Sequence, residues 1–407
     1  MNKKKESKVV PNVRFKGFTD DWKQRKLTEI VNRVNKSSNS DVLPKVEFED
    51  IVSGEGRLNK DISSKFDSRK GTLFEPENIL YGKLRPYLKN WLFSDFEGVA
   101  LGDFWVFEAT DVSVPSFDYY LIQSDDYQKV ANDTSGTKMP RSDWKNVSST
   151  DFAIPSKDEQ KQIGAFFKQL DDTITLHQQK ITLLIKLKKA MLEKMFPKKG
   201  TVIPEFRFNG FANAWEQRKL GELAEIVGGG TPSTSVESYW DGDIDWYAPA
   251  EIGEQIYLKS SQRKITEEGL NKSSAKVLPV GTVLFTSRAG IGKTAILLKE
   301  GCTNQGFQSI VPNKNKLDSY FIFTRSEELK RYGETVGAGS TFVEVSGKQM
   351  ANMELMMPTT MDEQQKIGEY FSNLDHLITL HQRKCDKYSS IKKGMMRDLL
   401  TGKIRLV

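Results

Sequence analysis

The chain has 407 residues, of which 60 are Lys or Arg and 54 are Asp or Glu, so the formal net charge is +6. Hydrophobic residues make up 38% and charged residues 28%, which excludes a disordered chain and, at about 150 residues per domain, predicts two or three domains. The sequence contains no apolar stretch near the about 18 residues of a membrane span, no apolar run in its start MNKKKESKVV and no CxxC pair, so we expect a cytoplasmic protein without a thiolate metal site.

The chain contains one pattern written twice. After a tail at 1–10, residues 11–30 (PNVRFKGFTDDWKQRKLTEI) match residues 204–223 (PEFRFNGFANAWEQRKLGEL) at eleven of twenty positions without a gap. Residues 158–196 match residues 362–400 at seventeen of thirty-nine positions. Two variable segments are therefore each followed by a long repeated segment, which predicts two copies of one fold with different surfaces.

The first variable segment, residues 1–153, is predicted to be a mixed α/β domain. Aromatic and branched residues at 78–88 (NILYGKLRPYL) and 103–109 (DFWVFEA) lie between Gly, Pro and Asp, which favours strands joined by irregular loops. Basic and aromatic loop residues are of the kind that bind phosphates and base edges, although each of them could equally be an ordinary solvated residue. The candidates for DNA binding here are Lys83, Arg85, Lys89, Lys138, Arg141 and Trp144.

Residues 154–200 are predicted to form the first of two long spacer helices. Apolar residues recur at alternating intervals of three and four, which is typical of a helix that packs on another helix. Ser156 and Glu159 have the spacing of a capping box, and Pro197 ends the helix. The residues expected at the seam between the helices are Ile163, Phe167, Leu170, Ile174 and His177.

The second variable segment, residues 201–356, is predicted to repeat the mixed α/β fold, with a strand in GTVLFTSR at 281–288. Arg can form specific hydrogen bonds with guanine and Asn or Gln with adenine, while Lys mainly neutralises phosphate. The candidates for DNA binding here are Arg288, Lys293, Asn304, Gln305, Ser340 and Thr341.

No motif in the chain specifies an active site. The segment SRAGIGKT at 287–294 ends like a phosphate-binding loop, but Ser287 stands where the first glycine is required, so a basic loop between strands is favoured. Gly228–Gly230 lacks the spacing of a dinucleotide-binding motif, which favours a flexible turn. Glu328 and Lys330 form a nuclease-like Glu-x-Lys tripeptide of almost no specificity. We therefore expect no catalytic residue in this chain.

The three histidines lie in the repeated helices. His177 and His381 occupy equivalent positions, and His376 precedes His381 by about one turn. A histidine pair between helices could bind a metal, but no carboxylate or cysteine pattern completes the ligand set. Packed, hydrogen-bonded histidines are favoured, and no metal is expected.

Residues 357–407 are predicted to form the second spacer helix, with Thr360 and Glu363 as its capping box and Gly402 at its end. Thirty-nine residues make a rod of about 58 Å, and its apolar stripe needs a partner. We expect an α+β protein in which two mixed α/β domains are joined by an antiparallel intramolecular coiled coil with pseudo-twofold symmetry. The seam residues of the second helix are Ile367, Phe371, Leu374, Ile378 and His381.

These repeated blocks resemble the specificity subunit of type I restriction-modification systems. The resemblance covers nearly the whole chain: the RFxGF…W…RKLxE opening occurs twice, and so does the Pro…EQxxIxxxF…LDxxIxLHxxK helix. The second variable segment adds GGGTPSTS, YWDGDIDWYAP, SRAGIGKTAI and NQGF. The resemblance implies that each variable segment is a target recognition domain, that the helices form a spacer and that the subunit has no active site.

The resemblance also implies the partners. They are double-stranded DNA, two modification subunits that methylate adenine at N6, and restriction subunits with endonuclease and translocase activity, with no membrane among them. S-adenosylmethionine, ATP and Mg²⁺ are expected on those subunits, and no cofactor on this chain. The first domain lacks the GGGTP turn and has LGDF in place of NQGF, which favours two unlike half-sites. A free-standing structural coiled coil and a self-sufficient nuclease or methyltransferase are the alternatives.

Overall fold

The structure is a computed structural model, and it describes residues 7–11, 13–65, 68–134, 138–253, 255–288, 290–338, 344–400 and 403–406. The chain divides into two compact units. Unit 1 comprises residues 1–179 and 382–407, and unit 2 comprises residues 180–381. Each unit therefore combines one globular domain with part of each long helix.

Unit 1 contains two four-stranded sheets, with strand orders β3-β10-β7-β8 and β4-β6-β9-β5. All their pairings are antiparallel except the parallel pair β5 and β9. The strands of the first sheet are β3 (Val31–Val34), β10 (Phe104–Ala109), β7 (Ile79–Gly82) and β8 (Trp91–Phe93). Those of the second are β4 (Ser37–Ser38), β6 (Gly71–Phe74), β9 (Gly98–Ala100) and β5 (Lys45–Val46).

The first four residues of strand β10, Phe104–Phe107, are buried on both faces of the sheet, which explains why they are all apolar or aromatic. Successive side chains of a strand point to opposite faces. Trp105 and Phe107 enter the core shared with the helices, whereas Phe104 and Val106 enter a second core. The sequence prediction of a strand at 103–109 is confirmed.

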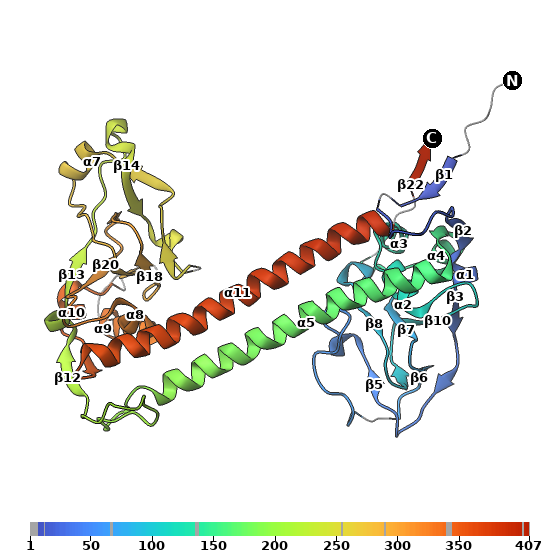
Figure 1. Cartoon of the computed structure of the whole chain (residues 1–407), viewed down its shortest axis with the longest axis horizontal. Coiled ribbons are helices and arrows are strands. Elements are labelled where there is room, and N and C mark those ends of the chain that lie inside the picture. The colour runs from blue at the N-terminus through green and yellow to red at the C-terminus, as the bar shows by residue number, and fades with distance from the viewer. Residues whose placement is uncertain are drawn as a thin grey trace. The chain divides into compact units, whose positions relative to one another are not determined.

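Short helices and two strand pairs complete unit 1 (Figure 1). Pro115 begins α2, where its missing N–H has no intrahelical partner to lose, and the Ser124 side chain caps α3 by accepting from the Tyr127 N–H. The helices are α1 (Leu27–Ile30), α2 (Pro115–Leu121), α3 (Asp125–Ala131) and α4 (Trp144–Ser149). The antiparallel pairs are β2 (Lys23–Lys26) with β11 (Asp151–Ile154), and β1 (Ser7–Val10) with β22 (Lys403–Leu406).

Unit 2 contains a five-stranded sheet, a three-stranded sheet and a separate strand pair. The first has the order β13 (Ala224–Gly228), β20 (Gln308–Pro312), β17 (Val283–Phe285), β18 (Thr294–Leu297) and β15 (Tyr257–Leu258). The second has the order β16 (Arg263–Ile265), β14 (Trp240–Tyr247) and β19 (Cys302–Thr303), and the pair is β12 (Glu216–Lys219) with β21 (Glu354–Met357).

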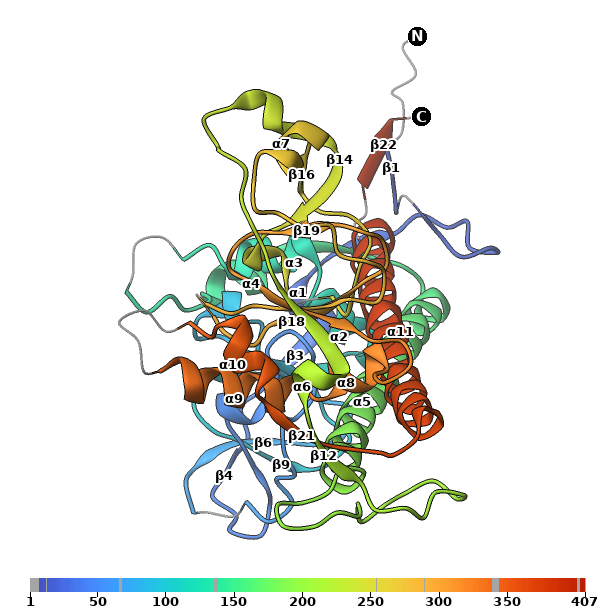
Figure 2. The same cartoon turned by 90° about the vertical axis from the view of Figure 1, so that its left-hand side faces the viewer.

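The short helices of unit 2 lie in two places. Helix α7 (Glu267–Asn271) belongs to the lobe of β14 and β16, which extends away from α8, α9 and α10 (Figures 1 and 2). The remaining helices are α6 (Leu220–Leu223), α8 (Ser319–Thr324), α9 (Ser326–Gly337) and α10 (Gly347–Ala351).

The long helices α5 (Lys157–Lys194) and α11 (Met361–Leu399) pair in opposite directions in each unit. In unit 1, Lys392 binds Asp171 and the Tyr388 ring stacks on His177, six residues further along α5. In unit 2, Lys188 binds Asp375, and the Phe196 ring beyond the end of α5 lies 6.3 Å from that of Phe371. Residue numbers of the contact partners thus decrease along α11 as they increase along α5, which confirms the predicted antiparallel pairing.

The predicted seam residues lie partly in the domain cores. Ile163 and Phe167 are buried with α2, and Ile367, Phe371 and Leu374 are buried in the core of unit 2. Leu170 packs against the edge of the first core, and the Ile174 carbonyl accepts from the Cys385 thiol. Ile378 and His381 are half-buried. The beginning of each helix therefore anchors a globular domain in addition to meeting the other helix. Gly402, expected at the end of the second helix, lies outside the described residues.

An arginine clamp explains the repeated RF block at the start of each domain. Arg14 binds Glu159 through two hydrogen bonds of 2.7 Å, and Arg207 binds Glu363 through two of 2.7 and 2.8 Å. Both glutamate side chains are 1% exposed. The predicted cap is confirmed at Thr360, whose hydroxyl accepts from the Glu363 N–H. The carboxylates of Glu159 and Glu363 are each held by an arginine of the preceding block.

Candidate nucleic-acid interface

Three loops of unit 1 meet at residues 83–85, 102–103 and 141–142, which we call the first platform. The Lys83 N–H donates to the Asp103 carbonyl, and the Ser142 N–H donates to the Lys83 carbonyl, both at 2.9 Å. The side chains of Arg141 and Lys83 converge on the Asp103 carboxylate at 2.8 and 3.7 Å. The structure thus brings two of the predicted residues together around an acid that sequence reasoning missed.

Unit 2 has the same arrangement at residues 287–288, 304–306 and 344–345, which we call the second platform. The Ser287 N–H donates to the Gly306 carbonyl at 2.8 Å, and the Val345 N–H donates to the Ser287 carbonyl at 3.0 Å. The backbone bridge between Leu84 and Arg141 in the first platform corresponds to that between Arg288 and Glu344 in the second. The backbones of the two platforms are therefore equivalent.

The side chains on the two platforms differ in size and charge. The position of Arg141 is taken by Glu344, that of Leu84 by Arg288 and that of Asp103 by Gly306. Gly306 leaves little room for a side chain, because a Cβ there would lie 3.0 Å from the Asn304 Oδ1, which accepts from the Gly306 N–H. The Arg288 side chain lies on the same side of Gly306. The two domains thus present different hydrogen-bonding groups on one backbone framework.

Gln305 is held by Thr231 of the GGGTP segment, whose hydroxyl donates to the Gln305 Oε1. The prediction of a flexible turn in this segment is wrong. A Cβ on Gly229 would lie 1.9 Å from the Asn304 carbonyl oxygen, and one on Gly230 would lie 2.3 Å from the Ala275 nitrogen. The glycines are there because neighbouring backbone approaches too closely for any side chain, and this packing brings Thr231 to Gln305.

The remaining candidates lie in several environments. Arg85 and Lys89 flank the turn Pro86–Leu88, with positive φ angles of 48° and 54°, and Lys138 is exposed. The Trp144 ring packs on Trp105 and Phe107, beneath the Arg33 guanidinium. The ring is therefore part of the core packing. Lys293 lies over Gly253. Ser340 and Thr341 fall outside the described residues.

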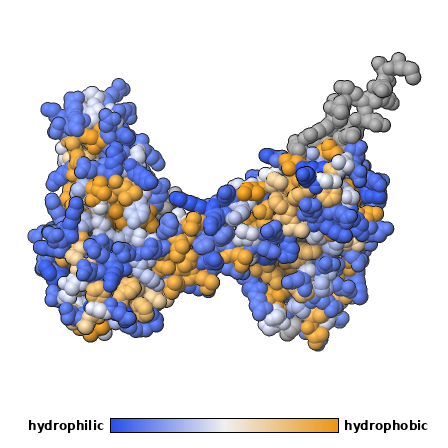
Figure 3. Space-filling model, in the orientation of Figure 1, coloured by the Kyte–Doolittle hydropathy of each residue, from blue (hydrophilic) through white to orange (hydrophobic). Residues whose placement is uncertain are grey.

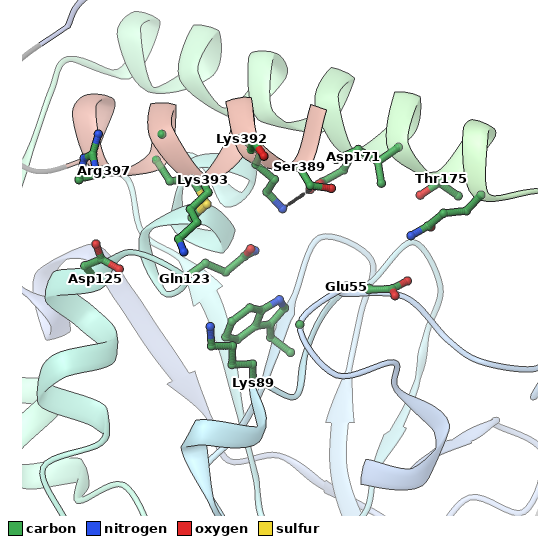
Figure 4. Close-up of a pocket in the computed structure, with 17 residues that line it drawn as sticks. Glu55, Lys89, Gln123, Asp125, Asp171, Thr175, Ser389, Lys392, Lys393 and Arg397 are labelled. Carbon is green, nitrogen blue, oxygen red and sulfur yellow. Dashed lines mark hydrogen bonds and ion pairs between the residues drawn. The ribbon is translucent and has the colours of Figure 1, made fainter. Parts of the chain in front are cut away.

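Lys89 lines a pocket of about 830 Å³ in unit 1, together with Glu55, Gln123 and residues of α5 and α11 (Figure 4). On the opposite wall Lys392 extends to Asp171, with which it makes an ion pair of 2.7 Å (Figure 4). Lys89 therefore lies on the side of the turn that faces the long helices.

The segment at 287–294 connects β17 to β18, as a basic loop between strands was expected to do. Two of its backbone donors are used within the loop: the Gly292 N–H donates to the Thr286 carbonyl, and the Lys293 N–H donates to the Thr286 hydroxyl. A phosphate-binding loop keeps such donors for its ligand. These two backbone donors are therefore not available to a phosphate.

Across the described ranges, no three His, Cys, Asp or Glu side chains are grouped so as to hold a metal ion. His177 instead stacks on Tyr388, with the ring planes at 12°. Within the same ranges, no helix has the length and apolar character needed to cross a bilayer.

The family model described as the type I restriction modification DNA specificity domain matches residues 19–186 and again residues 213–387. Among curated proteins, the MjaIX type I restriction enzyme specificity subunit of Methanocaldococcus jannaschii is 37% identical over 167 residues, which are 40% of this chain and 38% of that protein. This chain thus spans well under half the length of that relative. The HindI specificity subunit of Haemophilus influenzae is 20% identical over 83% of this chain and 90% of its own length.

Among solved structures, the S subunit of a type I restriction-modification system from M. genitalium has a TM-score of 0.65 at 13% identity, covering 96% of this chain and 99% of that one. At this identity the likeness concerns the fold alone. It agrees with the two mixed α/β domains and long helices expected from the sequence.

Proposed function

Because the chain belongs to the type I restriction modification DNA specificity family, we propose that it reads a bipartite, asymmetric DNA target and has no active site of its own. Each globular domain reads one half-site, and the long helices set the interval between them. The observation that carries this proposal is the pair of platforms, which have equivalent backbone hydrogen bonds and unlike side chains.

The chemistry of the platforms supports two different half-sites. The first platform offers cations, Lys83 and Arg141, that share one carboxylate. The second offers Arg288 with the amides of Asn304 and Gln305, which can donate to and accept from base edges in the major groove. Ion-paired cations suit phosphate or guanine, whereas amides also suit adenine, so the two surfaces favour different bases.

Exposed apolar residues on the long helices support a scaffold role. In unit 2, Leu183 and Ile185 of α5 are 64% and 51% exposed, and Leu377 of α11 is 40% exposed. In unit 1, Leu176 is 59% exposed. Apolar patches also interrupt the hydrophilic surface in Figure 3. Such residues are typical of surfaces covered by another protein.

We assign these surfaces to two modification subunits, which methylate adenine at N6, with restriction subunits bound beyond them. S-adenosylmethionine, ATP and Mg²⁺ belong to those partners, and the assembly acts on DNA in the cytoplasm. A modification subunit must turn its target base out of the duplex, because the reacting atom is inaccessible within the stack.

Alanine variants of the platforms test this proposal. Arg288→Ala with Gln305→Ala is expected to relax the sequence requirement of one half-site, and Lys83→Ala with Arg141→Ala that of the other, as measured by methylation sequencing of DNA modified by the complete methyltransferase complex. Each lost base contact is expected to cost about 1–3 kcal/mol of discrimination. Lys161→Ala on the exposed face of α5 is the control. A variant pair that alters both half-sites, or neither, contradicts the assignment.

A further inference from the structure

A tyrosine, an aspartate and a lysine form the same hydrogen-bonded network in both units. In unit 1, Asp171 of α5 accepts from the Tyr120 hydroxyl of α2 at 2.9 Å and from the Lys392 ammonium of α11 at 2.7 Å. Three chain segments therefore meet at one carboxylate: the globular domain and both long helices. Figure 4 shows the Lys392 and Asp171 arm of this network.

Unit 2 repeats the network with the two helices exchanged. Asp375 of α11 accepts from the Tyr320 hydroxyl of α8 at 2.7 Å and from the Lys188 ammonium of α5 at 2.6 Å. Each long helix therefore supplies the aspartate of one network and the lysine of the other. Lys188 lies seventeen positions after Asp171 on α5, and Lys392 lies seventeen positions after Asp375 on α11.

The charged side chains of both networks are largely shielded from solvent, so their hydrogen bonds can favour one alignment of the helices. Asp375 and Lys392 are 9% and 14% exposed, and Asp171 and Lys188 are 25% and 27% exposed. Burial and the neighbouring carboxylate raise the pKa of Tyr120 and of Tyr320, so both phenols remain neutral donors. A carboxylate in this setting accepts from both partners at once, and moving either helix along the other breaks one of its bonds.

We infer that Asp171 and Asp375 are positioning residues for DNA recognition. Each fixes the register of the helix pair and the position of one recognition domain on that pair. Together they restrict the protein to one length of the gap between the half-sites. This inference rests on the proposed function, because a gap exists only if the target is bipartite. The apolar seam alone tolerates small slips, since hydrophobic contact is not directional, whereas the networks require one alignment.

The test uses the complete methyltransferase complex and a DNA library in which the gap between the half-sites varies. The double variant Asp171→Asn with Asp375→Asn keeps side-chain size and an acceptor for each tyrosine but removes the charge that binds lysine. We expect the preference for the native gap over a gap one base pair longer or shorter to fall by at least about tenfold, which corresponds to about 1.4 kcal/mol. The half-site sequences are expected to stay unchanged.

Two further variants separate the parts of the network. Tyr120→Phe with Tyr320→Phe removes only the hydrogen bonds from the globular domains to the two aspartates. It is expected to relax the gap preference less than the asparagine variant does. Reversing each ion pair, with Asp171→Lys, Lys392→Asp, Asp375→Lys and Lys188→Asp, is expected to restore part of the preference that the asparagine variant loses. The matched control is Asp172→Asn with Asp386→Asn, which makes the same chemical change at exposed positions of the same helices.

The outcomes are distinguishable. If the asparagine variant binds its partners and keeps the wild-type gap preference, the inference is wrong while the proposed function stands. If the control relaxes the gap as much as the asparagine variant, general loss of helix charge is responsible and the inference is wrong. If the wild type itself methylates no two-part target, the proposed function has failed. Thermal unfolding of each variant identifies loss of fold. If the asparagine variant does not fold, the variant Tyr120→Phe with Tyr320→Phe tests the inference instead. An unchanged gap preference in that variant overturns the inference.

Discussion

Replacing Arg207 by methionine tests the arginine clamp that joins the second domain to α11. Arg207 and Glu363 are 11% and 1% exposed, so solvent screens their interaction little. The substitution removes two charge-assisted hydrogen bonds of 2.7 and 2.8 Å and leaves the carboxylate with the Trp215 indole N–H at 3.2 Å. Breaking a buried pair from one side costs about 3–5 kcal/mol, and because the indole bond survives we expect about 3 kcal/mol.

The double variant Arg207→Met with Glu363→Met removes both charges and is expected to recover at least about half of that loss, because apolar residues of similar size replace a buried ion pair at little cost. Urea unfolding gives the free energies, and hydrogen exchange over residues 204–223 locates the effect. Arg218→Met is the control, since its pair with Glu222 is 39% and 48% exposed and such pairs contribute about 0–1 kcal/mol. A loss below about 1 kcal/mol for Arg207→Met, or a double variant whose loss equals the sum of the single ones, would refute the clamp.

Further predictions concern acid stability, two glycines and domain exchange. Burial alone would raise the pKa of Asp50, but hydrogen bonds from Lys65, the Glu47 N–H and Lys60 outweigh burial and lower that pKa. The ionised Asp50 therefore stabilises the fold at neutral pH, and this stabilisation is lost as the pH falls below about 4. Asp50→Asn is expected to make unit 1 less stable at pH 7 and to flatten the acid dependence of thermal unfolding, and an unchanged slope would contradict this. Gly230→Ala is expected to destabilise unit 2 by more than about 1 kcal/mol, because the new Cβ would clash with neighbouring backbone. Gly394→Ala in α11 places a Cβ with nothing within 4 Å and is expected to stabilise the protein by up to about 1 kcal/mol. Equal effects of the two variants on urea unfolding would contradict both predictions. Exchanging residues 204–356 with those of a homologue is expected to replace one half-site only, and methylation sequencing that finds both replaced would contradict separate reading domains.

The repeat made the architecture predictable from sequence. Two copies of an amphipathic helix need an apolar partner, and their order along the chain favours opposite directions, which the ion pairs Lys392 with Asp171 and Lys188 with Asp375 confirm. The strand at Phe104–Ala109 was predictable because it begins with four consecutive apolar or aromatic residues, Phe104–Phe107. The strand order was not, because pairing depends on contacts between residues distant in the chain.

The candidate surfaces were only partly predictable. Arg141 and Lys83 were chosen for their charge, but Asp103, which holds them together, was missed although it directly precedes the aligned Phe104. Trp144 was chosen for its aromatic ring, and the ring proves to pack on the core. The repeated Asp171 and Asp375 carried a signal in the shared LDxxIxLH motif, but their tyrosine partners lie 51 and 55 residues away, and only the fold brings them together.

Methylation sequencing of DNA from cells that express this chain with its modification subunit tests the central claim most directly. We predict modified adenines within one target that consists of two unlike short sequences separated by a constant number of unspecified base pairs, with one modified adenine on each strand. A single uninterrupted recognition sequence, or two parts whose separation varies freely, would contradict the account.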